Sequence, residues 1–550
     1  MREEKQNLKS SGRPGVLAGT IIGIMLTAAL IAVLYAGWQL ADLPFVPFDV
    51  FDWTARVLPG RVIAFGIGSM VAVIRALNLG PTSAVAKMAE QTMGIAGLFV
   101  TGVVGGAVLF LVLRLFRGRH AYFLGLILGL VVGVPVVLIS HSVSHTAGVS
   151  PTAGATWILA TFILWGITFG WAYQQLLAAV VPAPDISVAP PLVERVSRRR
   201  FLVRLGGTTA VITVIGAVVG ALSQRRRSEG SLLADEERWS AVHELPNADA
   251  TVQPAPGTRP EFTPLEQHYR IDINTIPPRI DEHQWRLKIE GLVEKPLALT
   301  LDELRNHEPL HQFVTLACIS NPIGGDLIGT TRWTGVSLQH LLPKLGLKPE
   351  ATHLKIRSTD GFYETVPLEI VRSDERVMLT YAWDGVPLAV GHGFPLRIYI
   401  PDVYGMKQPK WIESIEAMDH WEPGYWVVRG WDKVARMKAT SVIDTVGMDM
   451  NIIHARQGTP IPIGGIAHAG ARGISRVEIQ VDGGDWQQAA LRTPLSNLTW
   501  VLWRYDWPFE SGEHTFVVRC YDGSSTPQIV TPAPPEPTGA SGLHSVKQRF

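Results

Sequence analysis

Cysteine is scarce in this chain: Cys318 and Cys520 are the only two among 550 residues. Two cysteines exclude a disulfide framework, although they leave a single bridge arithmetically open. No Cys-x-x-Cys, Cys-x-x-Cys-His or zinc-type Cys/His spacing occurs, so zinc, iron–sulfur clusters and covalently attached haem have no support in the sequence. Charge is also scarce, at 18% of residues with a formal net charge of +1. We therefore expect no nucleic-acid partner, because the chain has no basic surplus.

Charged residues are missing altogether from four long apolar stretches within residues 1–222. Each is long enough to cross a bilayer as a helix, which takes about 17–25 residues. The stretches are Val16–Leu40, Thr92–Leu113, Ala121–Ser140 and Ala155–Val181. A fifth, milder span is predicted at Leu205–Leu222, and Val62–Leu79, which contains Arg75, is predicted to be an interfacial or re-entrant helix. Residues 1–222 are therefore predicted to be a helical membrane region, with the lipid bilayer as a partner.

Basic residues flank these spans unevenly. The N-terminal tail and the connections after the second and fourth spans carry Lys and Arg, whereas His141–Gly154 carries neither. The positive-inside rule then places the N-terminus in the cytoplasm. Directly before the fifth span, Ser197–Leu202 reads Ser-Arg-Arg-Arg-Phe-Leu, which resembles the twin-arginine export motif. We expect an uncleaved anchor in a multi-pass protein of the cell membrane, with the rest of the chain on the extracytoplasmic side.

Haem in the membrane region is not supported. His141 and His145 lie four residues apart and would suit the axial ligation of a b-type haem if they shared a helix face. Histidines at a membrane surface are more often solvated loop residues. No haem is therefore assigned.

Beyond residue 222 the pattern becomes that of a soluble chain. Residues 223–262 are polar, and their prolines include Pro254, Pro256 and Pro260, which predicts a linker. Residues 263–436 mix short strands and helices and are predicted to form an α+β domain, with a capping box at Thr300–Glu303 and a helix capped by Ser337. Residues 437–550 alternate between strand and turn signals, which predicts an immunoglobulin-like β-sandwich. The predicted strands include Trp285–Glu290, Phe313–Ala317, His353–Arg357, Val377–Ala382, Leu396–Ile400, Ser475–Val481 and Thr515–Cys520.

Cys318 directly follows a predicted strand and opens a glycine-rich loop, Ile319–Gly329. Thiolate ligation of a soft, high-valent metal needs a cysteine at the edge of a cavity where a bulky cofactor can approach. A cysteine at a strand end is otherwise a small buried hydrophobic residue, so the residue type alone leaves both interpretations open. Cys520 lies in an alternating strand and is predicted to be a core residue.

Several ordered sequence blocks resemble the sulfite oxidase family of molybdopterin oxidoreductases. The block Leu316–Asn321, followed by Arg332–Val336, is similar to the family's segment that carries the molybdenum ligand. The family's pterin-binding segment is resembled by His392–Arg397, Tyr404–Lys407 and Lys410–Ile412. The resemblance covers residues 263–550 and implies a molybdopterin-binding domain followed by a dimerisation-type sandwich.

The resemblance also implies roles for individual residues. Cys318 would be the catalytic residue and the protein's ligand to molybdenum, in a two-electron oxo transfer. Arg397, Lys407 and Lys410 would provide charge-assisted donors to the phosphate of the pterin. The residues implied to bind the cofactor are Tyr269, Arg270, Asn321, Asp360, His392, Arg397, Gly405, Lys407 and Lys410. The implied partners are a small-molecule substrate, a separate electron-transfer partner (a cytochrome or a membrane carrier) and, by analogy, a second copy of the chain.

The substrate is left open by one departure from the family's pattern. Sulfite oxidases resemble one another in an arginine shortly after the ligating cysteine, but this chain has Asn321-Pro322-Ile323 there and no arginine until Arg332. An exported methionine sulfoxide reductase subunit in the same family also lacks that arginine. Reduction of methionine sulfoxide or other S- or N-oxides is therefore one alternative function. A non-catalytic envelope binding protein on this fold is the other.

Overall fold

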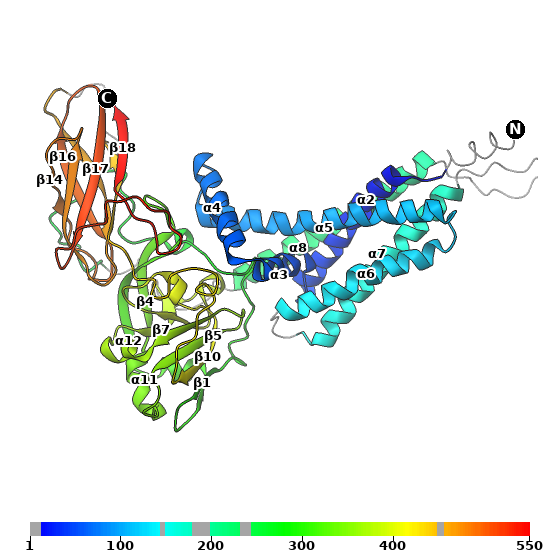
Figure 1. The fold of residues 1–550 in the computed structure, drawn as a ribbon, viewed down its shortest axis with the longest axis horizontal. Coiled ribbons are helices and arrows are strands. Elements are labelled where there is room, and N and C mark those ends of the chain that lie inside the picture. The colour runs from blue at the N-terminus through cyan, green and yellow to red at the C-terminus, as the bar shows by residue number, and fades with distance from the viewer. Residues whose placement is uncertain (1–12, 144–148, 179–197, 231–243, 448–455) are drawn as a thin grey trace, which may run out of the picture. The chain divides into compact units, whose positions relative to one another are not determined.

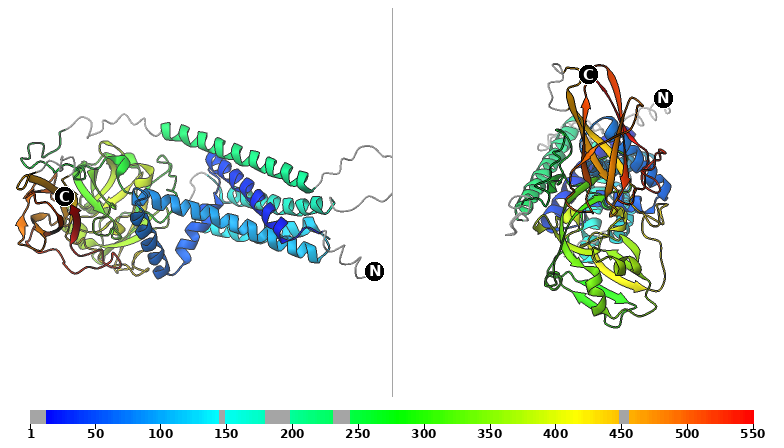
Figure 2. Two further views of the ribbon diagram at one scale, coloured as in Figure 1. Left: turned by 90° about the horizontal axis from the view of Figure 1, so that it is seen from above. Right: turned by 90° about the vertical axis from the view of Figure 1, so that its left-hand side faces the viewer.

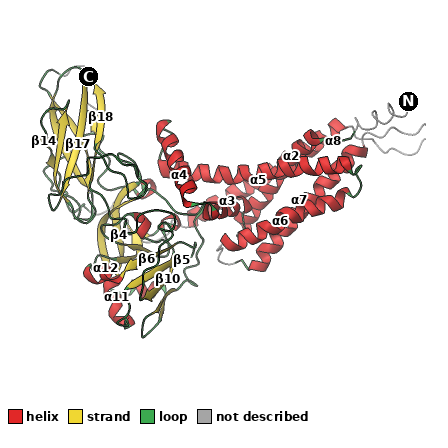
Figure 3. Ribbon diagram, viewed as in Figure 1, coloured by secondary structure: helices red, strands yellow, loops and turns green. Residues whose placement is uncertain are grey.

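The computed structural model describes residues 13–143, 149–178, 198–230, 244–447 and 456–550 (Figure 1). The chain forms two compact units. As far as they are described, Met1–Val57, Lys87–Leu233 and Asn274–Arg279 form the first unit, and Leu58–Ala86, Ala234–Ile273 and Ile280–Phe550 form the second. Helices dominate the first unit, and strands dominate the second (Figure 3). Each unit therefore includes a segment from the other half of the sequence.

Five helices in the N-terminal half are long and apolar enough to cross a membrane. They are α2 (Val16–Ala41), α5 (Thr82–Leu115), α6 (Ala121–Val143), α7 (Pro151–Ala178) and α8 (Arg198–Gly230). The five predicted spans are confirmed as helices, although α5 begins at Thr82 rather than at Thr92. Its additional turns contain Lys87 and Glu90, and their ion pair of 2.8 Å keeps this charged stretch helical. In the export-like motif, Arg198–Leu202 open α8, while Ser197 lies outside the described residues, as does His145.

Glycines let two pairs of these helices approach backbone to backbone. A Cβ on Gly19 of α2 would lie 2.3 Å from the carbonyl oxygen of Gly106 on α5. A Cβ on Gly125 of α6 would lie equally close, at 2.3 Å, to the carbonyl oxygen of Gly166 on α7. Small residues at the contact are the usual means of packing helices inside a bilayer. Helix α8 runs along α2 (Figure 2).

Two shorter helices, α3 (Val46–Val57) and α4 (Gly60–Ala76), connect α2 to α5 and are bent by 120° at the break between them. The pair is a broken span or a re-entrant loop. The predicted interfacial helix Val62–Leu79 corresponds to α4. Helix α3 belongs to the first unit and α4 to the second.

Two sheets, one mixed and one antiparallel, build the α+β domain of the second unit. One sheet has the order β2-β1-β10-β5-β6, and the other has the order β3-β4-β7-β8, with β9 paired to β7. The strands of the first sheet are β1 (Leu287–Gly291), β2 (Leu297–Leu299), β5 (His353–Ser358), β6 (Tyr363–Pro367) and β10 (Ile412–Met418). Those of the second are β3 (Leu310–Ala317), β4 (Ile328–Ser337), β7 (Met378–Trp383), β8 (Val386–Pro387) and β9 (Arg397–Tyr399).

Short helices cover these sheets and close the hydrophobic core between them. They are α10 (Leu301–Arg305), α11 (Leu338–Leu345) and α12 (Leu368–Ser373), with 3-10 turns η1 (Leu265–Gln267), η2 (Val390–His392) and η3 (Gly405–Lys407). The predicted capping box is confirmed, because Thr300 and Glu303 bond each other's backbone N–H. Helix α11 begins where predicted, directly after Ser337. The Ser337 hydroxyl, however, makes no capping hydrogen bond.

Two four-stranded antiparallel sheets form the C-terminal domain. One is β11 (Thr440–Val446), β12 (Pro460–His468), β16 (Val501–Pro508) and β15 (Ala490–Leu491); the other is β14 (Gln487–Gln488), β13 (Ile474–Val481), β17 (Glu513–Asp522) and β18 (His544–Arg549). Both sheets contribute to one core, which includes Ile461, Trp503, Val477 and the fully buried Cys520. Cys520 is therefore a core residue, as predicted.

The predicted linker, residues 223–262, is helical at its start, because α8 continues to Gly230. Its other described part, residues 244–262, packs against this C-terminal domain. Arg492 forms a 2.9 Å ion pair with Glu261, and Glu261 also accepts a 2.6 Å hydrogen bond from Asn247. Arg259 pairs with Asp444 of β11 at 2.6 Å. These residues hold the stretch in place despite its lack of regular secondary structure.

Candidate active site

The loop after β3 presents Cys318 at the end of a buried strand. The Cys318 N–H donates to the Leu327 carbonyl at 2.9 Å, and the Cys318 carbonyl accepts from the Asn321 N–H at 3.1 Å. The side chain of Asn321 accepts from the Leu327 N–H at 3.0 Å. Gly325 is required here, because a Cβ would lie 2.2 Å from the Asn321 carbonyl oxygen Oδ1. The loop is thus closed on itself and holds the thiol in a fixed place.

The half-buried Cys318 side chain lies among polar and aromatic neighbours. Its Sγ lies 2.9 Å from Ser320 Oγ, and Cys318 packs against the cluster that contains Tyr269 and Trp333. Burial raises the pKa of Cys318, although the hydrogen bond with Ser320 opposes this. Without a metal the thiol therefore remains protonated. A bound metal cation reverses that preference, because a coordinating thiol is deprotonated.

The same loop caps helix α5. Asp326 Oδ2 accepts a 2.7 Å hydrogen bond from the backbone N–H of Thr82, the first residue of α5. The first N–H groups of a helix lack partners inside the helix and carry partial positive charge, so a carboxylate is a favourable cap. Both residues belong to the second unit. Residues 58–86 thus contribute to the surroundings of the Cys318 loop.

Next to Cys318 lies a group of side chains, here called the polar cage, in which three buried residues and Arg397 meet the half-buried His392: His268, Trp333, Trp383, His392 and Arg397. The rings of Trp383 and His392 are 4.4 Å apart, and His268 lies 5.5 Å from Trp383 and 5.6 Å from His392. The guanidinium of Arg397 lies 4.6 Å over the Trp333 ring. The members come from the residue after η1, from β4, β7 and β9, and from η2.

Three buried polar atoms of the polar cage have no hydrogen-bond partner among the described residues: His268 Nε2, Trp333 Nε1 and Arg397 Nε. Each such atom costs about 1–3 kcal/mol if it stays unsatisfied. All three side chains are at most 5% exposed. The cage therefore fits a planar, polar group with hydrogen-bonding capacity on several edges, as a pterin has.

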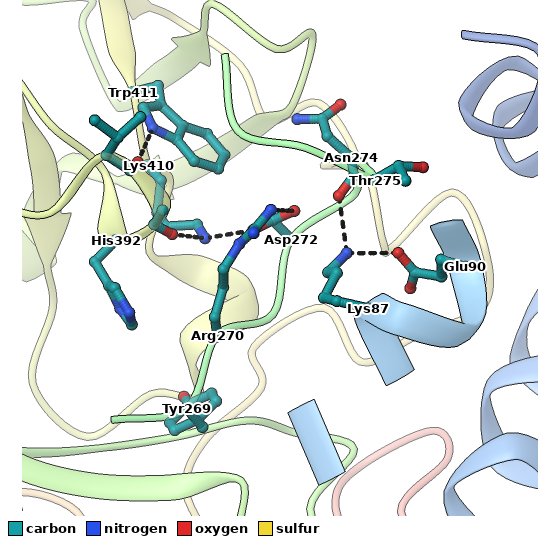
Figure 4. Close-up of polar contacts among 12 residues, drawn as sticks. Lys87, Glu90, Tyr269, Arg270, Asp272, Asn274, Thr275, His392, Lys410 and Trp411 are labelled. Atoms are coloured by element: carbon teal, nitrogen blue, oxygen red, sulfur yellow. Dashed lines mark hydrogen bonds and ion pairs between the residues drawn. The ribbon is translucent and has the colours of Figure 1, made fainter. Parts of the chain in front are cut away.

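A cluster of charges, here called the cation cluster, lies beside the cage and consists of Arg270, Asp272 and Lys410 (Figure 4). Asp272 pairs with Arg270 at 2.7 Å and with Lys410 at 3.0 Å. Lys410 also donates to the Gly391 carbonyl at 3.0 Å, next to His392. With Arg397, three cations face one carboxylate, which leaves a net charge of about +2. This surplus suits a phosphate dianion.

Burial lowers the pKa values of the histidines, Arg397 and Lys410, which favours their neutral forms. It lowers the pKa of His268 to about 4 and holds that of His392 well below its usual value. Burial also lowers the pKa of Arg397 to about 10 and that of Lys410 to about 8, with Asp272 opposing the shift at Lys410. The histidines are therefore neutral donors at pH 7, while Arg397 and Lys410 remain charged.

The structure divides the predicted cofactor-binding residues into two groups. Tyr269, Arg270, His392, Arg397 and Lys410 come together around Cys318 and the polar cage. Gly405 also lies here, because a Cβ on it would be 3.4 Å from the Tyr269 hydroxyl and 3.5 Å from the Ala317 carbonyl.

The other three predicted residues use their side chains within the protein. Asn321 closes the Cys318 loop, and Asp360 accepts from the Phe362 N–H at 3.0 Å in the turn between β5 and β6. Lys407 forms a buried 3.0 Å ion pair with Glu364. The charge of Lys407, predicted to meet the phosphate, is therefore already matched by a carboxylate.

Sequence reasoning missed His268, Asp272 and Trp383 as members of the site. His268 and Asp272 flank the predicted Tyr269-Arg270 pair, so their proximity in sequence was an available signal. Trp333 belongs to a block that resembles the metal-ligand segment, but its indole gave no indication of a cage. Trp383 carries no local signal, because only the pairing of β4 with β7 brings Trp333 and Trp383 side by side.

Part of this chain is similar to proteins of known function. A profile described as "Oxidoreductase molybdopterin binding domain" matches residues 274–426. Mitochondrial sulfite oxidase of Mus musculus is 29% identical over 308 residues, which cover 48% of this chain and 56% of that enzyme. The chain contains a molybdopterin-binding oxidoreductase domain similar to that of sulfite oxidase. The family resemblance predicted from the sequence is thereby confirmed.

Other similar proteins are named for a different substrate or for none. The NAD(P)H nitrate reductase of Hordeum vulgare is 27% identical over 287 residues, which cover 42% of this chain and 32% of that enzyme. A protein named "Uncharacterized oxidoreductase YuiH" from Bacillus subtilis is 29% identical over 156 residues, which cover 28% of this chain and 76% of that protein. The chain spans about half the length of the mouse enzyme. These similarities therefore leave the substrate open.

Proposed function

We propose that this protein is a membrane-anchored, extracytoplasmic oxidoreductase that moves an oxygen atom to or from a small substrate at molybdenum ligated by Cys318. The observation that carries the proposal is the polar cage beside that cysteine. Its buried atoms without partners among the described residues suit a pterin, and the surplus of positive charge beside it suits the pterin's phosphate.

The bound cofactor would supply the two-electron oxygen-atom chemistry. The chain's own residues would bind and orient it. Arg397 and Lys410 neutralise negative charge, and His268 and His392 offer neutral ring nitrogens because burial lowers their pKa values. Cys318 provides a sulfur on a closed loop, so its position is set before the metal arrives.

The relatives' names, sulfite oxidase and nitrate reductase, support a small oxyanion as the substrate class. A specific observation favours the alternative, reduction of methionine sulfoxide or another uncharged S- or N-oxide. Asn321 follows Cys318 where sulfite oxidases resemble one another in an arginine, and its carbonyl oxygen is engaged by the Leu327 N–H. An anionic substrate would lack a guanidinium clamp from this loop.

The membrane side of the proposal rests on the helices. Five apolar helices, or six with the bent pair, are long enough to span a bilayer, and the arginines that open α8 suit twin-arginine export of a folded, cofactor-loaded domain. Electrons would then pass singly to a separate cytochrome or membrane carrier. The immunoglobulin-like assignment of the C-terminal sandwich and its use in homodimerisation remain predictions.

The test is metal and pterin analysis of the full-length protein purified in detergent, with Cys318→Ser beside the wild type. We expect molybdenum and pterin in the wild type, and turnover reduced by more than about 100-fold in Cys318→Ser. Assays with sulfite, nitrate and methionine sulfoxide, using artificial electron carriers, identify the substrate. A wild type without molybdenum, or a Cys318→Ser enzyme with unchanged turnover, would overturn the proposal.

A further inference from the structure

One peptide group of the first unit lies between two opposite charges from different helices. The Asn274 carbonyl accepts a 2.8 Å hydrogen bond from Lys87 Nζ of α5, and the Thr275 N–H donates to Asp52 Oδ1 of α3 at 2.9 Å. This carbonyl and this N–H belong to the same peptide bond. The ammonium therefore meets the negative end of the peptide dipole, and the carboxylate meets the positive end. We call Asp52 and Lys87 the peptide clamp.

The side chains of the clamped residues are bound as well. The Thr275 hydroxyl donates to Asp52, and Arg56 Nη2 donates to Asn274 Oδ1 at 2.8 Å. Lys87 is also paired with Glu90 (Figure 4). Thr275 is fully buried and Asn274 is 6% exposed. Buried charges are costly unless their hydrogen-bonding capacity is used, and both clamp residues use it to hold this short segment.

The rest of Asn274–Arg279 is also fixed to the membrane helices. Ile276 packs against the hydrophobic core of the helix bundle. Arg279 forms an ion pair with Asp42, and its guanidinium lies 5.3 Å from the centre of the Trp38 ring. A segment held by charge at its start, by an apolar side chain in the middle and by an arginine at its end is firmly seated.

The clamped peptide is close in sequence to the site described above. Asp272, which binds Arg270 and Lys410 of the cation cluster, is separated from Asn274 by Ile273 alone. Two residues span at most about 7 Å when fully extended. Because the covalent connection is this short, the place of the clamped peptide limits where Asp272 can lie.

We propose that Asp52 and Lys87 are positioning residues for the cofactor. By fixing the peptide between Asn274 and Thr275, they set the place of Tyr269–Asp272 and, through Asp272, the orientation of Arg270 toward the pterin. The membrane helices are thus part of the cofactor-binding machinery as well as an anchor. This inference rests on the proposed function, because it requires a molybdopterin beside the cation cluster.

Asp49 provides a matched control for Asp52. It lies on the same helix, one turn earlier, and accepts a 2.6 Å hydrogen bond from Ser140 of α6. The experiment uses the full-length holoenzyme in detergent and measures the rate of pterin release, by fluorescence of the oxidised pterin, together with the molybdenum(V) resonance spectrum. We expect Asp52→Asn and Thr275→Val to release pterin about tenfold faster than the wild type, with an altered spectrum, and Asp49→Asn to match the wild type.

Conservative changes separate positioning from folding. Lys87→Met is expected to release pterin as fast as Asp52→Asn, and Lys87→Arg to restore slow release, because an arginine can still donate to the Asn274 carbonyl. Thr275→Val keeps both charges in place and decides the matter if Asp52→Asn fails to fold. This inference alone would be overturned if Thr275→Val and Lys87→Met released pterin at the wild-type rate, or if Asp49→Asn released it as fast as Asp52→Asn. A wild type without molybdenum would overturn the proposed function and this inference with it.

Discussion

Two buried polar clusters in this protein are built in opposite ways. In the peptide clamp, Asp52 and Lys87 each bind a group of the protein's own backbone. In the polar cage, His268 Nε2, Trp333 Nε1 and Arg397 Nε have no such partner among the described residues. Burial without partners is too costly to persist unless something else satisfies the atoms. The charged side chains of the peptide clamp therefore stabilise the fold, whereas these three atoms of the polar cage can still bond to a ligand.

The two units also exchange segments. The N-terminal half of the sequence contributes residues 58–86 to the second unit, where the Thr82 N–H donates a hydrogen bond to Asp326 of the Cys318 loop. The other half gives Asn274–Arg279 to the first unit, where the peptide clamp holds it. A catalytic domain that was merely tethered would need neither exchange. Cutting the chain between its halves would therefore remove a built-in part from each unit.

The largest effect expected from this comparison is on stability, at the partnered pair Lys407–Glu364. Lys407→Met leaves Glu364, which is fully buried, without its cation. Breaking a buried pair by removing one partner costs about 3–5 kcal/mol. We expect a large fall in the melting temperature of the full-length protein, with molybdenum retained in the fraction that stays folded.

The control for this prediction is the double variant Lys407→Met with Glu364→Leu, which removes both charges and is expected to recover most of the lost stability. The opposite pattern, an unchanged melting temperature with loss of pterin, would restore the interpretation of Lys407 as a phosphate ligand and break the comparison.

Arg397→Met is expected to act on the ligand instead of the fold. Arg397 is a buried cation whose pKa is lowered by burial to about 10, so its charge destabilises the apoprotein. Losing one hydrogen bond to a charged group costs about 1.5–3 kcal/mol, or roughly 10–100-fold in cofactor affinity. Titration of the apoprotein with molybdopterin measures the affinity. The apoprotein's melting temperature should stay level or rise. A fall as large as that of Lys407→Met, with normal cofactor affinity, would show that Arg397 stabilises the fold and does not bind the ligand.

The features that sequence could predict are those with local causes. Four charge-free stretches of bilayer length and one milder apolar span identified the five long helices of the described residues, and Thr300 with Glu303 specified a helix start, because neither signal depends on distant contacts. The end of β3 at Ala317, directly before Cys318, followed from strand and turn signals in the same way. At Ser337 the local signal predicted the helix start correctly but not the capping hydrogen bond, because α11 begins after Ser337 and its hydroxyl makes no such bond.

The features that sequence could not predict depend on which distant residues meet. The partner of Lys407 in η3 is Glu364 on the distant strand β6, so a lysine expected to face phosphate is already neutralised. Asp52 and Lys87 stand out as charges among apolar helices, but nothing near them in sequence names the Asn274–Thr275 peptide as their partner. The polar cage likewise forms only when η2 and strands β4 and β7 come together.

The smallest effect expected concerns pH, through Lys410. Its pKa is about 8 in the folded protein, lowered from 10.5 by burial against the opposing effect of Asp272. In the unfolded chain Lys410 keeps its proton to higher pH, so the apoprotein should gain stability as pH rises from about 8 toward 10.5. Cofactor retention should change in the opposite direction, because the ammonium that attracts phosphate is lost over the same range. We expect pterin release a few-fold faster at pH 9 than at pH 7, and Lys410→Arg to remove this dependence because arginine stays charged. If retention and apoprotein stability instead rose together with pH, Lys410 would belong with the partnered charges of the fold and not with the ligand site.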